Sequence, residues 1–265
     1  GGARPHKDGV VLGLSKMNKI LSIDPDNRVA QVQPGVRNLA ISNAAKPHGL
    51  YYAPDPSSQI ACSIGGNVAE NAGGVHCLKY GLTVHNVLGV RVLTSDGDVM
   101  EIGGALYDNP GLDMLALLCG SEGMLGIVTQ VTVALLPEPE KKSVILAGFK
   151  QVTDAGNAVA SIIGAGIIPA GMEMMDKLAV QAAEQFAHAG YPLDAAAILI
   201  IELDGAEAEL SAVTAQVIDH LNASGAYQID QADDAETQAR LWKGRKSAFP
   251  AVGRLSPDYI CMDGT

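Results

Sequence analysis

Short apolar runs separated by turn residues fill the first half of the chain. The runs at 20–23 and 29–33 flank Asp-Pro-Asp-Asn at 24–27, a turn composition, and predict a β-hairpin. From residue 36 to residue 45 the apolar positions keep helical spacing, and Pro47 and Gly49 end the predicted helix. Further along, the pattern predicts a second hairpin at 87–93 and 99–102, a helix at 112–118 and a long strand at 127–136.

Beyond residue 143 the pattern changes to longer alternating elements. It predicts strands at 144–149, 168–174, 197–203 and 227–229, and helices at 152–163, 177–189, 210–223 and 234–246. If the helix at 177–189 is an insertion, the order is β-α-β, β-α-β, which is typical of a ferredoxin-like antiparallel sheet with helices on one face. Pro137-Glu138-Pro139 separates the two patterns, since proline cannot continue a ladder, and we predict domains at 1–139 and 140–265.

Length and charge narrow the possible functions. A chain of 265 residues is long for one compact domain and comfortable for two. The formal net charge of −11 argues against nucleic-acid binding, which needs a basic face. The sequence has no apolar run of membrane-spanning length. Its four cysteines (Cys62, Cys77, Cys119 and Cys261) are scattered, so we expect no zinc or iron–sulfur site and a reducing, cytoplasmic environment.

The densest candidate chemistry lies at residues 54–74, PDPSSQIACSIGGNVAENAGG. Gly65-Gly66 and Gly73-Gly74 could form an anion-binding cradle. Glycines adopt positive φ and let the backbone approach a ligand, and small neighbours leave N–H groups pointing outward for phosphate oxygens. The two pairs could equally be tight turns that bracket a short helix. Spacing alone leaves both readings open.

Histidines and glycine-loop carboxylates are weaker candidates. His76 and His85 flank the glycine-rich stretch and could line a pocket, although a structural role is favoured at both positions. His188 and His220 are expected to be solvated residues near helix C-termini. Glu70 and Glu122 lie in glycine-rich turns, where a carboxylate would repel phosphate, so a helix N-terminus or a ribose hydroxyl suits them better.

Common nucleotide and hydrolase signatures are absent from the sequence. It has no G-x-x-x-x-G-K-[ST], no G-x-G-x-x-G between a strand and a helix, and no G-x-S-x-G. Arg245 follows Trp242 in W-x-x-R-K. It could grip a substrate carboxylate, or it could end a basic surface helix. From these residues alone the second reading is favoured.

A resemblance appears when the motifs are taken in order. They are Pro34-Gly35-Val36, PDPSSQIACSIGGNVAENAGG, Lys79-Tyr80-Gly81, TSDG, GSEGMLGIVTQVTVALLP, W-x-x-R-K and Asp263-Gly264-Thr265. This order resembles the FAD-linked oxidases of the vanillyl-alcohol oxidase superfamily, of the glycolate oxidase type, whose relatives oxidise D-lactate and D-2-hydroxyglutarate. The resemblance implies an α+β fold in which a PCMH-type FAD-binding domain is followed by a ferredoxin-like cap domain.

The family resemblance also assigns roles to residues. It implies FAD as cofactor, with hydride passing from the α-carbon of a small 2-hydroxy acid to flavin N5, and Arg245 binding the substrate carboxylate. The implied catalytic base and metal ligands lie in an H-x-G-D-G-N-x-H motif that this chain does not contain, so we predict no base and no metal ligand here. The residues implied to contact FAD are Pro54, Gly65, Gly66, Asn67, Asn71, Gly73, Gly74, Gly81, Glu122, Gly123, Gly126, Ile127 and Val128.

Further expectations concern the whole protein. The chain starts at Gly1 without Met and lacks most of the family's first pyrophosphate loop. We therefore expect an internal piece, truncated at both ends, that is inactive alone and binds FAD weakly or not at all. The resemblance implies that electrons pass to iron–sulfur and second flavin-type subunits of a glycolate oxidase complex, peripheral to the inner membrane at most. The alternative is a non-catalytic accessory subunit with the same fold.

Overall fold

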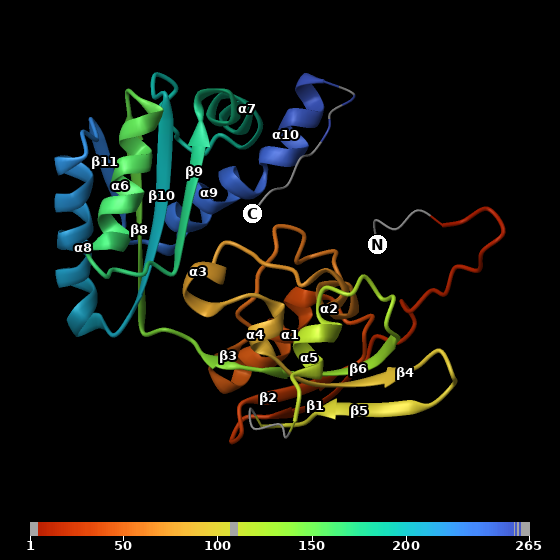
Figure 1. The fold of residues 1–265 in the computed structure, drawn as a ribbon. Coiled ribbons are helices and arrows are strands. Elements are labelled where there is room, and N and C mark those ends of the chain that lie inside the picture. Colours follow the sequence, from red (N-terminus) through yellow and green to blue (C-terminus); the bar gives the residue numbers. More distant parts are fainter. Residues whose placement is uncertain (1–4, 107–110, 257, 259, 261–265) are drawn as a thin grey trace. The chain divides into compact units, whose positions relative to one another are not determined.

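The computed structural model describes residues 5–106, 111–256, 258 and 260. The chain divides into two compact units, Gly1–Glu138 and Pro139–Thr265 (Figure 1). This division falls within the Pro137-Glu138-Pro139 segment that separates the two sequence patterns. Each unit has its own sheet and its own buried core.

The first unit is built on a five-stranded antiparallel sheet with the order β1-β2-β6-β4-β5. Its strands are β1 (Ile20–Asp24), β2 (Val29–Val32), β4 (Val87–Leu93), β5 (Val99–Gly103) and β6 (Ile127–Ala134). Both predicted hairpins are confirmed, since β1 pairs with β2 and β4 pairs with β5. Strand β6 lies between the two hairpins and pairs with one strand of each, which joins them into one sheet.

Short helices and a small second sheet complete the first unit. The predicted first helix is confirmed as α1 (Asn38–Ala45). The others are η1 (Lys46–His48), α2 (Ile64–Glu70), α3 (Cys77–Tyr80), α4 (Thr83–Asn86) and α5 (Met114–Leu118). The strand predicted at 127–136 stops at Ala134, and the Leu135 N–H donates to the carbonyl oxygen of Arg28, the residue before β2, at 2.7 Å. A separate strand, β7 (Leu136–Pro137), then pairs with β3 (Leu50–Tyr51).

The second unit contains a four-stranded sheet with the order β11-β8-β10-β9. Its strands are β8 (Lys141–Phe149), β9 (Gly171–Asp176), β10 (Ala197–Gly205) and β11 (Gln228–Ala232), and every pair is antiparallel. Numbered along the chain, the strands lie in the order 4-1-3-2, as the predicted ferredoxin-like arrangement requires. Helices α6 (Val152–Gly164) and α8 (Glu207–Ala223) pack on one face.

The two helices of the β-α-β, β-α-β pattern lie on one face as predicted, but the opposite face of this sheet is also covered, which the pattern did not predict. Helices α7 (Lys177–Ala187) and α9 (Ala235–Lys246) bury that face, and α10 (Ala248–Leu255) packs against α7 (Figure 1). The physical reason lies in β8 and β10, which bury residues on both sides. In β10, Leu199 and Ile201 join the core under α6 and α8, while Ile198 and Ile200 join the core under α7 and α9.

Candidate functional site

The first glycine pair lies inside a helix. Helix α2 begins at Ile64, and the Ser63 side chain caps it by accepting from the Gly66 N–H at 3.4 Å. The Gly65 N–H donates to the Pro34 carbonyl oxygen at 2.9 Å. These donors are used within the protein, so the expectation that they point outward for phosphate is wrong. The predicted short helix exists, but it contains Gly65 and Gly66 instead of starting after them.

Close packing against other chain segments explains most of these glycines, because their φ angles are not positive. None of the four paired glycines has positive φ; the left-handed residue of this segment is Asn71, with φ 50°. A Cβ at Gly65 would lie 2.7 Å from the Pro34 Cβ, and one at Gly74 would lie 2.5 Å from the Asp55 carbonyl carbon. A Cβ at Gly73 would approach Leu82 Cδ2 to 2.9 Å. These positions require glycine because other chain segments touch them.

A buried amide network fixes the start of the glycine-rich stretch. Asn38 is 1% exposed, and its Nδ2 donates to the Pro54 carbonyl oxygen at 2.9 Å and to Asn67 Oδ1 at 3.1 Å. Asn67 is also buried, and its Nδ2 donates to Cys62 Sγ at 3.4 Å. The side chain of Asn67 therefore holds the fold together. Sequence reasoning missed Asn38. Its position three residues before Ile41 and seven before Ala45 places it on the buried side of α1, and a polar residue on that side could have been noticed.

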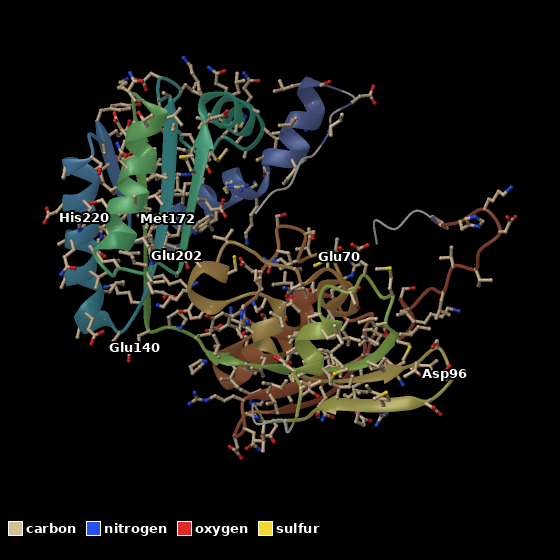
Figure 2. All side chains as sticks on the ribbon, viewed as in Figure 1. Glu70, Asp96, Glu140, Met172, Glu202 and His220 are labelled. Carbon is tan, nitrogen blue, oxygen red and sulfur yellow. The ribbon has the colours of Figure 1, made fainter. Side chains whose placement is uncertain are left out.

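The C-terminal end of α2 joins two further candidate segments. Asn71 Oδ1 accepts from the Val84 N–H at 2.9 Å, which attaches α4. The Val68 and Ala69 carbonyl oxygens accept from the N–H groups of Gly120 and Glu122, each at 2.8 Å. The structure thus brings the 54–74 stretch and the 120–126 loop together around α2. Glu70 is the exposed last residue of α2, so placing it at a helix N-terminus is wrong (Figure 2).

The 120–126 loop has a strained backbone and open space. Glu122 has φ 54° and Gly123 has φ 75°, and a Cβ at Gly123 would meet nothing within 4 Å. Gly126 is closely packed instead, because a Cβ there would collide with Val92 Cγ1. The loop leads into β6, where Ile127 and Val128 are half-buried.

The second glycine pair has backbone donors available for a ligand. Among the described residues, the N–H groups of Gly73, Gly74 and Val75 have no hydrogen-bond partner. The next residue, His76, is fixed: its N–H donates to Asp55 Oδ1 at 3.2 Å, and its Nδ1 lies 3.0 Å from Asp55 Oδ2. Three successive open donors on a pinned segment can bind an anionic or carbonyl oxygen ligand.

The histidine next to Gly81 has a local role. Gly81 has φ 79°, and a Cβ there would lie 2.8 Å from His85 Cβ. His85 Nδ1 accepts from the Leu82 N–H at 2.9 Å. This turn connects α3 to α4. The side chain of His85 supports the turn at a position that only glycine can occupy.

In the second unit, Arg245 lies in the last turn of α9 and is paired with a carboxylate. Its Nη2 and Nε donate to Oε2 of Glu173, on β9, at 2.7 Å and 3.0 Å. Its side chain is 27% exposed, so it is not a surface helix end. Sequence reasoning missed Glu173, which lies 72 residues earlier.

Side-chain hydrogen bonds fix helix α9 to the rest of the second unit. Trp242 Nε1 donates at 2.6 Å to Oε2 of Glu202, a 3% exposed residue of β10 (Figure 2). Lys142 Nζ donates to the other oxygen of Glu202 at 2.8 Å. Tyr191 Oη donates to the Leu241 carbonyl oxygen at 2.5 Å, and burial raises the pKa of Tyr191, which keeps this donor protonated. Gln238 Nε2 donates to the Ala232 carbonyl oxygen at 3.0 Å.

The late-helix histidines differ from one another. His188 is exposed at the C-terminus of α7, as predicted, and its backbone has the left-handed conformation. His220 is half-buried, and its Nδ1 lies 2.7 Å from Ser161 Oγ, linking α8 to α6 (Figure 2). The prediction that His220 is solvated is therefore wrong. Of the cysteines, Cys261 lies outside the described residues.

Family comparison defines the class of protein. Residues 1–103 match the family model for the FAD binding domain, and residues 138–265 match the C-terminal domain of FAD linked oxidases. The chain belongs to the FAD-linked oxidases, and its cofactor is FAD. The open donors at 73–75 and the open loop at Gly123 fit such a group, because both offer unoccupied backbone to a phosphate or a flavin oxygen.

Comparison with curated relatives shows which FAD-linked oxidases this chain is similar to. The chain is 60% identical over 265 residues to glycolate oxidase subunit GlcD of Escherichia coli (strain K12), covering 100% of this chain and 53% of that protein. It is 40% identical over 266 residues to the subunit of the same name in Bacillus subtilis, covering 100% and 57%. It is 35% identical over 255 residues to D-lactate dehydrogenase of Archaeoglobus fulgidus, covering 95% and 56%. The chain spans about half the length of these relatives.

Solved structures share the fold. An alkyldihydroxyacetonephosphate synthase matches with a TM-score of 0.74 and 21% identity, covering 91% of this chain and 46% of that one. A p-cresol methylhydroxylase matches with a TM-score of 0.68 and 17% identity, covering 88% and 53%. The described residues include no helix long and apolar enough to cross a membrane. The same residues include no group of three or more His, Cys, Asp or Glu side chains placed to hold a metal ion.

Proposed function

We propose that the whole protein oxidises a small 2-hydroxy acid to the 2-oxo acid, with glycolate as substrate and D-lactate as the second candidate. The observation that carries this proposal is the 60% identity, over the entire chain, to a subunit named for glycolate oxidation. Similarity to D-lactate dehydrogenases supports the broader substrate class.

We propose that the first unit, close to residues 1–139, binds FAD through the cluster around α2. When bound, FAD supplies the acceptor for the hydride that leaves the α-carbon. The open donors at 73–75 would bind oxygen atoms of the cofactor, and the backbone at Gly123 would allow close approach. Gly65 and Asn67 would act indirectly, since their polar groups are used to shape the segment.

We propose that the second unit, close to residues 140–265, binds the substrate carboxylate through Arg245. A guanidinium binds a carboxylate with two parallel hydrogen bonds, which fixes direction as well as charge. Orientation matters because hydride transfer requires the C–H bond to point at the acceptor. The contacts of Trp242 and Leu241 hold α9 so that Arg245 emerges at a fixed place.

The test is substitution of Arg245 in the whole protein, spanning the length of its relatives. Arg245→Ala should lower kcat/KM for glycolate about a hundredfold, because two charge-assisted hydrogen bonds are each worth about 1.5–3 kcal/mol and part of this is replaced by water. Arg245→Lys should recover part of the lost kcat/KM. Arg240→Ala, an exposed arginine of the same helix, is the matched control. Bound flavin, measured by absorbance, should stay unchanged in all three variants.

Two results would contradict the proposal. Unchanged kinetics in Arg245→Ala would remove this residue from the substrate site. Failure of the wild-type protein to reduce a dye with either glycolate or D-lactate, with FAD bound, would favour the non-catalytic accessory subunit instead.

We also propose that electrons leave through iron–sulfur and second flavin-type subunits, with the complex at most peripheral to the inner membrane. The relatives in E. coli and B. subtilis are named as subunits of glycolate oxidase, which supports a larger assembly. Purifying the tagged protein from its own cells should bring down iron-containing partners. A protein that purifies alone, and still transfers electrons to the cellular acceptor, would contradict this.

A further inference from the structure

We propose that Glu173 is a positioning residue for substrate binding: it occupies one edge of the Arg245 guanidinium and thereby presents the adjacent edge to a substrate carboxylate. This inference rests on the proposed function, because it assumes that Arg245 binds substrate. It adds a second residue, on a different element, whose role the motif containing Arg245 does not reveal.

The argument begins with the geometry of the pair. A guanidinium has five N–H donors in one plane, and they form separate edges that can each take a carboxylate. Glu173 uses the edge made by Nε and Nη2, through its single oxygen Oε2. Among the described residues, Nη1 of Arg245 has no hydrogen-bond partner. The edge made by Nη1 and the second Nη2 hydrogen is therefore open to a bidentate ligand.

The surrounding fold fixes Glu173 in place. In the sheet, Glu173 on β9 faces Ile200 on β10, and Gly171 faces Glu202. Glu173 and Glu202 therefore point to the same face from adjacent strands. On α9, Trp242 and Arg245 are three residues apart and lie on one side of the helix. Two helix donors thus meet two sheet carboxylates, Trp242 with Glu202 and Arg245 with Glu173.

Two readings of Glu173 predict opposite effects. As a positioning group, it removes rotamer freedom from Arg245 before substrate arrives, so its loss weakens binding. As a competing anion, it would occupy the place of the substrate, so its loss would strengthen binding. The open Nη1 edge favours the first reading, because Glu173 leaves one carboxylate-binding edge of the guanidinium free for the substrate.

The experiment compares Glu173→Ala with Glu173→Gln in the whole protein. Gln keeps an oxygen that can accept from Nε and Nη2 but removes the charge; Ala removes both. We expect Glu173→Ala to raise KM for glycolate about tenfold, the cost of fixing one arginine side chain, with kcat changed less than threefold. Glu173→Gln should restore KM to within about threefold of wild type. Calorimetric titration with oxalate, an unreactive carboxylate, should show the same pattern in Kd.

The controls separate this inference from the function itself. Glu207→Ala, which breaks the exposed ion pair with Lys141, should leave KM and Kd unchanged. If Arg245→Ala has no effect, the proposed role of Arg245 is wrong. If Arg245→Ala is impaired but Glu173→Ala matches wild type, only the role of Glu173 is overturned. Tighter oxalate binding in both Glu173 variants, or equal weakening in both, would also overturn it.

A folding defect would not leave the question open. If Glu173→Ala fails to fold, Glu173→Asp keeps the charge but withdraws the carboxylate by one methylene group. The positioning role then requires Glu173→Asp to raise Kd for oxalate about tenfold with flavin content intact. Wild-type affinity in that variant would refute the proposal.

Discussion

Gly244, the residue before Arg245, allows α9 to approach the end of α7 closely. It is buried in α9, and a Cβ added there would lie 2.6 Å from the Cβ of Ala189 and would collide with the Tyr191 hydroxyl. Tyr191 cannot move freely, because it is 4% exposed and donates to Leu241. A methyl group at position 244 must therefore push α9 away from its place.

The expected change in the free energy of unfolding for Gly244→Ala follows from two opposing effects. Glycine to alanine in a helix interior stabilises by up to about 1 kcal/mol, whereas overpacking a dense core costs about 1–3 kcal/mol. Overpacking wins here because Ala189 is also fully buried. We expect Gly244→Ala to lower the free energy of unfolding of the second unit by about 1–2 kcal/mol. Gly156→Ala is the matched control, since Gly156 lies exposed in α6 with nothing within 4 Å, and it should stabilise by about 0.5–1 kcal/mol.

Trp242 provides the assay, because it is the single tryptophan of this chain and lies in α9. Urea unfolding followed by its fluorescence should show a midpoint about 0.5–1 M lower for Gly244→Ala, and a higher midpoint for Gly156→Ala. Adding Ala189→Gly to Gly244→Ala should recover part of the loss, since it removes one of the two colliding groups and leaves the Tyr191 hydroxyl in place. A higher midpoint for Gly244→Ala would refute the packing argument, because helix propensity would then dominate.

Three more predictions concern the first unit. Gly123→Ala should weaken FAD binding without unfolding the unit, because φ 75° strains alanine by about 1 kcal/mol but the added methyl meets no protein atom; flavin titration and circular dichroism together check this, and lost secondary structure would contradict it. Gly74→Ala should destabilise the unit by more than about 2 kcal/mol, because its Cβ would lie 2.5 Å from the Asp55 backbone; an unchanged melting temperature would show that this segment can shift. Cys119 should resist alkylation at pH 8 while Cys62 reacts, because burial raises the pKa of Cys119 to about 11, and raising the pH toward that value should speed the labelling of Cys119. Mass spectrometry of each peptide measures the two labelling rates, and equal rates at pH 8 would contradict this prediction.

Much of the second unit could be predicted because its elements are long and regular. The strand order also followed from the β-α-β pattern. The coverage of both sheet faces did not, although the signal was present: residues 144–147 and 197–201 are continuous apolar runs, and strands buried on both faces carry such runs instead of alternating.

The candidate sites were predictable only in part. Motif order located the segments around α2, but the reason for each glycine depends on which distant atom touches it, as Pro34 touches Gly65. The partner of Arg245 was unpredictable for a similar reason. Glu173 reaches it through the register of β9 against β10 and the placement of α9, and both depend on contacts with residues that are distant from Arg245 in the sequence.

Helix cover on both sides of the second sheet changes how this unit can meet other molecules. A ferredoxin-like domain with helices on one side keeps a bare, flat face on which a partner can spread. In the described part of this unit, Val144 and Leu146 on that face are already packed beneath α7 and α9. Other molecules can therefore contact this unit at its helix ends and at the edge strands β9 and β11. Glu173 belongs to one of those edges and Arg245 to one of those ends, so recognition here is a matter of a few directed polar groups and not of broad apolar area.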